Sequence, residues 1–106
     1  MNDREMVLLY VAGIFDLNEG AKSLVDNALK YLSRSNTSLD QVRARDCLVM
    51  AVGDRYKEIG PETFELRREN GTGFRFHHTR HEKTTTWVVD VIFSRNGSST
   101  SVSWEE

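Results

Sequence analysis

The sequence contains little cysteine and little proline, shows no strong excess of one charge, and has no apolar run of membrane length. Cys47 is the only cysteine among 106 residues, so no disulfide can form within the chain. A small domain without disulfides is typical of a reducing compartment, and we therefore predict a cytoplasmic protein. The longest apolar stretch, residues 6–15, has roughly half the length that a membrane-spanning helix requires, so we predict no membrane partner.

The charge balance limits the class of partner. Fourteen Lys and Arg residues stand against sixteen Asp and Glu residues, which gives a formal net charge of −2. A general binder of polyanions carries a strong basic excess, so the whole surface is not of that kind. The sequence also has no glycine-rich phosphate loop, no cysteine pair and no HExxH motif, and we predict neither a cofactor nor a metal site.

Pro61, the only proline, divides the chain into a helical half and a strand half. Residues 4–15 are apolar on nearly every side, which fits a buried helix or a buried strand, and their length favours a helix. Asp16 and Glu19 have the spacing of a capping box and predict a second helix that ends near Arg34. A third helix is expected over residues 39–59. The residues expected on its core side are Val42, Val49, Val52, Tyr56 and Ile59.

After Pro61 the apolar residues alternate with polar ones, as in half-buried strands. Strands are expected near residues 64–67, 74–77, 86–94 and 100–104, with turns at residues 70–73 and 96–97 and a polar connection over residues 81–85. Helices followed by strands predict an α+β fold. We expect residues 1–106 to form one domain, with two to three N-terminal helices packed on one face of a C-terminal four-stranded antiparallel β-meander.

The first hairpin, residues 64–83, is the most basic part of the chain. Five basic residues there stand against three acidic ones, and all three histidines of the chain lie in it. If Phe74 and Phe76 point to the helices, Arg75 and His77 share the opposite sheet face. Such a face could attract an acidic protein, with Arg67 and Arg80 contributing, or it could hold nucleic-acid phosphates.

The strand at residues 86–94 has apolar side chains on both faces, which a sheet covered on one side does not need. Val88 and Ile92 would then face outward, and Trp104 adds a further apolar surface near the end of the chain. A second copy of the chain, as in a homodimer, or another protein could cover them. The predicted binding residues are Arg67, Arg75, His77, Arg80, Val88, Ile92 and Trp104.

The leading functional hypothesis is a small intracellular protein-interaction module that acts through its sheet without catalysis, as an adaptor, inhibitor or immunity-type binder. The first alternative is a nucleic-acid-binding module that uses the basic hairpin, residues 64–83. The second alternative is a small enzyme of unknown chemistry. A metal site would pair His77 with His81 or His78 with Cys47, and Cys47 is also the candidate nucleophile. Two neighbouring strand residues point to opposite faces, so His77 and His78 are not expected to share one ion.

Overall fold

The computed structural model describes residues 1–35, 37–93 and 96–106, and in these ranges helices precede strands, as the sequence predicts. The helices are α1 (Asp3–Phe15), α2 (Glu19–Arg34) and α3 (Ser38–Val52), followed by a short 3₁₀ turn, η1 (Gly53–Arg55). The strands are β1 (Tyr56–Gly60), β2 (Thr63–Arg67), β3 (Gly73–His81), β4 (Thr84–Ile92) and β5 (Ser99–Glu105). They form one antiparallel sheet in the order β1-β2-β3-β4-β5. The α+β class is confirmed.

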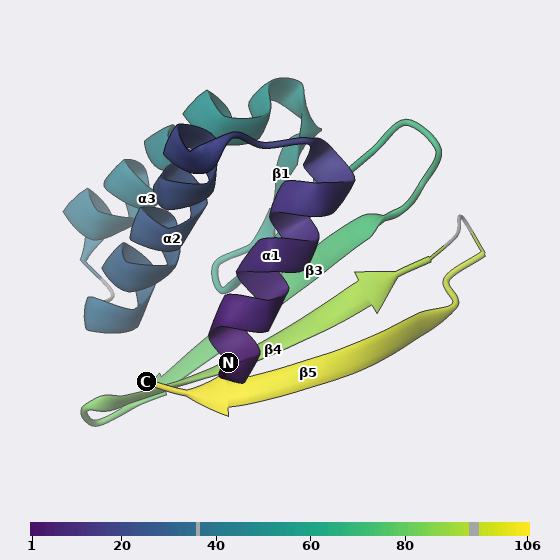
Figure 1. Cartoon of the computed structure of the whole chain (residues 1–106). Helices are drawn as coiled ribbons and strands as arrows, with labels where there is room; N and C mark the ends of the chain where they lie inside the picture. Colours follow the sequence, from purple (N-terminus) through teal and green to yellow (C-terminus); the bar gives the residue numbers. More distant parts are fainter. Residues whose placement is uncertain (36, 94–95) are drawn as a thin grey trace.

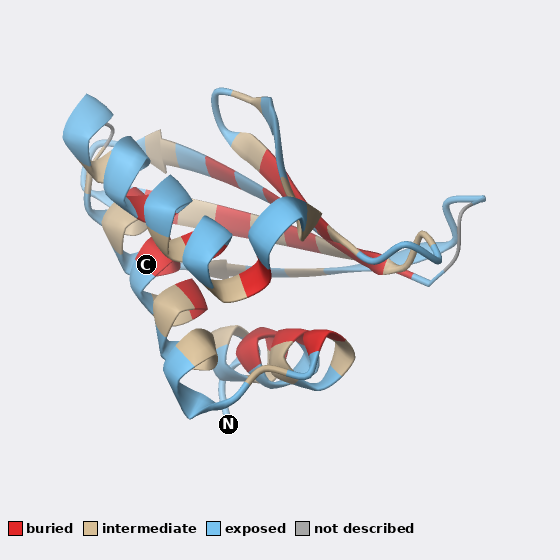
Figure 2. Ribbon diagram, turned by 90° about the horizontal axis from the view of Figure 1, so that it is seen from above, coloured by how far each residue is buried: buried red, intermediate tan, exposed pale blue. Residues whose placement is uncertain are grey.

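The helices lie together on one face of the sheet (Figure 1). Buried residues gather between the two layers, while the opposite face of the sheet is not covered by any element of the described ranges (Figure 2). Phe74, Phe76, Trp87 and Leu29 are among the side chains that fill this single core. No helix within the described residues has the length and apolar character needed to cross a membrane.

The sheet has five strands instead of the expected four because the third helix ends earlier than predicted. α3 ends at Val52, and Gly53 then adopts φ +64, a left-handed conformation that favours glycine and breaks the helix. The next residues form β1, with Tyr56 paired to Leu66 of β2. Tyr56 and Ile59 happen to continue the helical spacing of Val52, which explains the incorrect helix end.

The core side of α3 also differs from the prediction. Ala44, Leu48 and Val52 are buried, whereas Val42 and Val49 are exposed. Because α3 is apolar on several sides, the sequence pattern alone does not choose the face that packs on α2.

Two further local predictions were wrong by a few residues. Asp16 does not cap α2; it ends α1 in the left-handed conformation, and the N-cap is Asn18, whose Oδ1 accepts a hydrogen bond of 2.8 Å from the amide of Ala21. The polar connection expected over residues 81–85 is a tight turn of Glu82 and Lys83, because β3 and β4 continue to the paired residues His81 and Thr84. The predicted strand end at residue 94 lies outside the described ranges.

Candidate functional site

The uncovered face of the sheet, called the open face below, is defined by the side chains that alternate with the buried ones. Arg75 and His77 lie on it because Phe74, Phe76 and His78 point to the helices. The strand register adds neighbouring side chains from the other strands. The open face thus includes Lys57, Thr63, Glu65, Arg67, Arg75, His77, Val88, Asp90, Ile92, Ser101 and Ser103.

Glu65 organises the basic residues of the open face. Its Oε2 lies 2.7 Å from Nε of Arg75, and its Oε1 lies 3.2 Å from Nε of Arg67. The residue is only 6% exposed. Burial alone raises the pKa of Glu65, but the hydrogen bonds from Arg75 and Arg67 outweigh it and hold the pKa below its ordinary value. The two predicted arginines are therefore brought together, and one carboxylate offsets part of their charge.

His77, Val88 and Ile92 are also on the open face, but they do not form an exposed apolar patch. Nδ1 of His77 lies 2.7 Å from Oγ1 of Thr63 on the neighbouring strand. Val88 is half-buried beside it, and Ile92 is only 6% exposed. The expectation that Ile92 needs a covering partner is wrong, because the folded chain already buries it.

Arg80 and Trp104 point to the helix side of the sheet, so they do not belong to the open face. Arg80 donates from Nη1 to the carbonyl oxygen of Ser33 at the end of α2 and, over 3.0 Å, to Oγ1 of Thr85. Trp104 stacks on Trp87 with ring centroids 6.0 Å apart. Arg80 thus joins the sheet to α2, and Trp104 packs against the core. The sequence pattern missed both roles because the place of each residue depends on strand register.

The histidines do not gather around one point. His78 is buried under the helices, and its ring centroid lies 4.9 Å from that of Trp87. Burial lowers the pKa of His78 and raises the pKa of the Cys47 thiol, so both groups favour their neutral forms. No group of three or more His, Cys, Asp or Glu residues within the described ranges could hold a metal ion.

A depression of about 650 Å³ lies where η1 and β1 meet the β2–β3 hairpin. We call it the basic depression. It is lined by Asp54, Arg55, Lys57, Arg67, Arg68, Glu69 and Asn70. Arg67 is fixed here from two sides, because its Nη1 also donates to the carbonyl oxygen of Gly71 over 2.6 Å. Within the described residues, the side chains of Lys57 and Arg68 make no hydrogen bond or ion pair.

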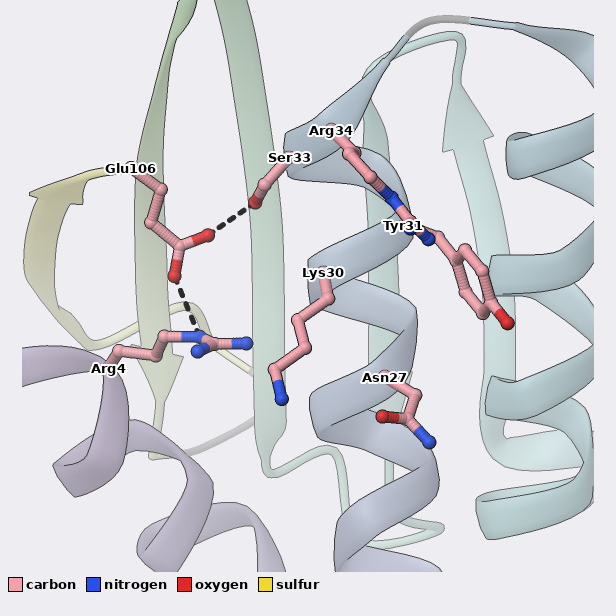
Figure 3. A pocket seen from close by; sticks show the side chains of 7 residues that line it. All are labelled: Arg4, Asn27, Lys30, Tyr31, Ser33, Arg34 and Glu106. Carbon is pink, nitrogen blue, oxygen red and sulfur yellow. Dashed lines mark hydrogen bonds and ion pairs between the residues drawn. The ribbon is translucent and has the colours of Figure 1, made fainter.

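A second depression, of about 510 Å³, lies between the start of α1, the end of α2 and the end of β5 (Figure 3). We call it the Glu106 depression. Nε of Arg4 lies 2.7 Å from Oε1 of Glu106, and Ser33 donates to the other carboxylate oxygen. Arg4 also reaches Oδ1 of Asp26 over 2.6 Å, and Lys30 lies 3.4 Å from Oδ2 of the same carboxylate.

The cations of the Glu106 depression are therefore largely used within the chain. Arg34, at its rim, lies over the Tyr31 ring at 5.0 Å. The Arg4 pairs and the Ser33 hydrogen bond join α1, α2 and β5, which is a structural task. The basic depression differs because two of its cations, Lys57 and Arg68, have side chains that make no such bond to any residue that the structure describes.

Sequence reasoning found Arg67 but missed Lys57, Arg55 and the role of Arg68. Lys57 falls within the helix expected over residues 39–59, whereas its place in β1 puts it opposite Glu65 on the open face. Arg55 lies in η1, with its guanidinium 5.0 Å above the Phe15 ring. The helix-breaking Gly53 is the signal that would have moved both residues to the sheet edge.

Comparison with known proteins identifies no relative: no family model, no curated protein and no solved structure matches the chain.

Proposed function

We propose that this protein is an interaction module that binds an acidic segment of a partner protein at the basic depression, without catalysis. One observation carries the proposal: Lys57 and Arg68 line a concave surface with Arg55 and Arg67, yet their side chains make no hydrogen bond or ion pair within the described residues. Cations held in a depression without internal partners are available to carboxylates from outside.

Arg67 is held in one orientation, so its guanidinium can bind a carboxylate in a defined geometry. Arg67 is held by Glu65 and by the carbonyl of Gly71, so its guanidinium loses little conformational entropy when a carboxylate approaches. Lys57 and Arg68 would add steering by charge, an effect that falls as salt rises. Asp54 and Glu69 at the same rim disfavour a highly charged polyanion and favour a segment with spaced carboxylates.

Nucleic acid is the less favoured partner for the same surface. Binding of single strands relies on exposed aromatic rings on which bases stack. Phe74 and Phe76, the aromatic residues of the basic hairpin strand, are fully buried beneath the helices. The remaining attraction would come from phosphates alone, which supports weak and unspecific binding.

Fluorescence anisotropy with a labelled peptide of alternating Glu and Ser residues, whose carboxylates are spaced, tests the proposal at an ionic strength on the order of 50 mM, where screening is moderate. We expect saturable binding that weakens as salt is added. The double variant Lys57→Gln/Arg68→Gln should bind about fivefold more weakly, because two rim cations that contribute about 0.5 kcal/mol each together contribute about 1 kcal/mol.

The matched control is Lys30→Gln/Arg34→Gln, which removes the same charge from the Glu106 depression. It should bind the peptide with nearly wild-type affinity. Equal losses in both variants would show that only net charge matters, and no binding by the wild type would also overturn the proposal. A labelled oligothymidine in a parallel titration tests the alternative, which tighter binding of the oligonucleotide would favour.

A further inference from the structure

The outer edge of β5 offers backbone groups for a further strand. Thr85 and Glu106 exchange both backbone hydrogen bonds, each 2.8 Å long, and the register continues without interruption to Ile92 and Ser99. In an antiparallel pair, every second residue turns its N–H and C=O away from the partner strand. The outward residues are Ser99, Ser101, Ser103 and Glu105, and all four are exposed.

The two edges of the sheet differ in their protection. β1 has five residues, a register shift between Glu58 and Gly60, the charged Lys57, and Pro61 directly after it. Charges, bulges, prolines and short length are the features that prevent strand addition at an edge. β5 pairs over seven residues without a shift and carries no charge before Glu105. Figure 1 shows β5 at one edge of the sheet, and no strand of the described ranges lies beyond it.

We propose that a second copy of this chain adds to β5, so that two antiparallel β5 strands join two sheets about a twofold axis at Val102. Only outward residues can exchange hydrogen bonds across this edge, and the register centred on Val102 is the one that pairs all four of them, with Ser101 facing Ser103 of the second copy. Ser99 then faces Glu105 of the second copy. The result is one continuous ten-stranded sheet.

The charge pattern of β5 favours a second copy in this antiparallel register. The acidic end, Glu105 and Glu106, meets the uncharged beginning of the other strand, where the Ser99 hydroxyl can donate to the Glu105 carboxylate. A parallel arrangement would place like charges side by side, which is destabilising. On the helix side, the half-buried Val102 meets Val102 of the second copy as a close pair of β-branched side chains.

This dimer is independent of the acidic-partner proposal, because the basic depression lies at the β1 and β2 end of the sheet, away from β5. Pairing at β5 would leave a basic depression at each outer edge of the joined sheet. The two proposals therefore succeed or fail separately.

Light scattering after size-exclusion chromatography tests the dimer with two variants at one position. The wild type should show twice the 12.2 kDa mass of the chain. Ser103→Pro removes an outward N–H and none of the N–H groups that bond β4, and it should give a monomer, whereas Ser103→Thr keeps the outward N–H and should remain dimeric. Circular dichroism confirms that both variants are folded.

Amide hydrogen exchange provides a second measurement on the wild type. The amides of Ser101 and Ser103 should exchange more slowly as protein concentration rises, because pairing buries them. A wild-type monomer at concentrations on the order of 100 μM would overturn the proposal, as would a Ser103→Pro protein that stays dimeric or outward amides whose exchange is independent of concentration.

Discussion

The two faces of β3 carry the same kinds of residue in opposite environments. His78 and Arg80 point to the helices, where His78 is buried against Trp87 and Arg80 bonds the end of α2. Arg75 and His77 point to the open face, where Arg75 pairs with a neighbouring strand and His77 lies in solvent beside Thr63. One register position thus decides whether an arginine or histidine stabilises the fold or remains at the surface.

The difference shows that local basic composition is a poor guide to a binding surface. The hairpin at residues 64–83 has a basic excess, but Arg80 is used by the helix layer and Arg75 by Glu65. Among the cations that line the basic depression, the side chains of Lys57 and Arg68 make no bond to the described residues. Changes on each face should therefore have different consequences, and stability measurements separate them.

The largest expected effect follows the removal of an aromatic ring from the covered face. Phe76 is fully buried and stacks on Phe64 with ring centroids 4.8 Å apart. Phe76→Ala should lower the free energy of unfolding by about 3–5 kcal/mol, because it leaves a cavity. Arg75→Ala, one position away on the open face, should cost about 1 kcal/mol or less, since Arg67 still pairs with Glu65. Urea unfolding measures both, and equal losses would contradict the comparison.

Two serine-to-alanine changes sharpen the comparison for polar groups. On the covered side, Oγ of Ser33 accepts a 2.7 Å hydrogen bond from Nε1 of the fully buried Trp87. Ser33→Ala should cost about 1–3 kcal/mol, because the indole N–H loses its partner. Ser101→Ala removes an exposed hydrogen bond to Asp90 and should change the free energy of unfolding by no more than about 0.5 kcal/mol. Thermal unfolding of both variants measures the two losses of stability. A larger loss for Ser101→Ala than for Ser33→Ala would contradict the comparison.

The buried histidine predicts a pH dependence of stability. Burial lowers the pKa of His78 in the folded state below the ordinary value of 6.5. Above that value the buried, neutral His78 contributes its full share to the free energy of unfolding. As pH falls below the pKa of His78 in the unfolded chain, the unfolded state binds a proton more readily than the folded state, and this contribution is lost. His78→Phe should therefore lose less stability than the wild type between about pH 7 and pH 5.5. Parallel plots of the free energy of unfolding against pH for the wild type and His78→Phe would show that His78 does not cause the pH dependence.

The smallest expected effect on stability concerns the free cations. Lys57→Gln/Arg68→Gln should change the free energy of unfolding by no more than about 0.5 kcal/mol, because neither side chain makes an internal bond in the described part of the chain. Chemical denaturation of this double variant provides the value. A large loss would assign these residues to the fold and would remove the basis of the proposed binding surface.

The sequence predicted the parts of the fold that strong local patterns determine. The helix over residues 19–34 has one apolar stripe, and the alternation of Phe74 and Phe76 with Arg75 and His77 placed the two faces of β3 correctly. The end of α3 was predicted wrongly because Tyr56 and Ile59 continue a helical spacing, while a single glycine conformation at Gly53 decides the outcome.

The candidate site was less predictable, because it depends on strand register. Arg67 was found, but Lys57 reaches the same surface only through the unpredicted strand β1. Arg75 and Arg80 are both arginines of β3, but an odd number of positions separates them. Their side chains therefore lie on opposite faces of the sheet. Trp104 likewise stacks on Trp87 because the β4–β5 register places the two residues opposite each other.

A nuclear magnetic resonance titration of the ¹⁵N-labelled protein with the unlabelled peptide of alternating Glu and Ser residues tests the central claim most directly, since it locates the bound peptide on the molecule. The largest amide shifts should fall on residues that line the basic depression, above all Lys57, Arg67 and Arg68. Shifts centred on Arg4, Lys30 and Arg34 would place the acidic ligand in the Glu106 depression and contradict the account.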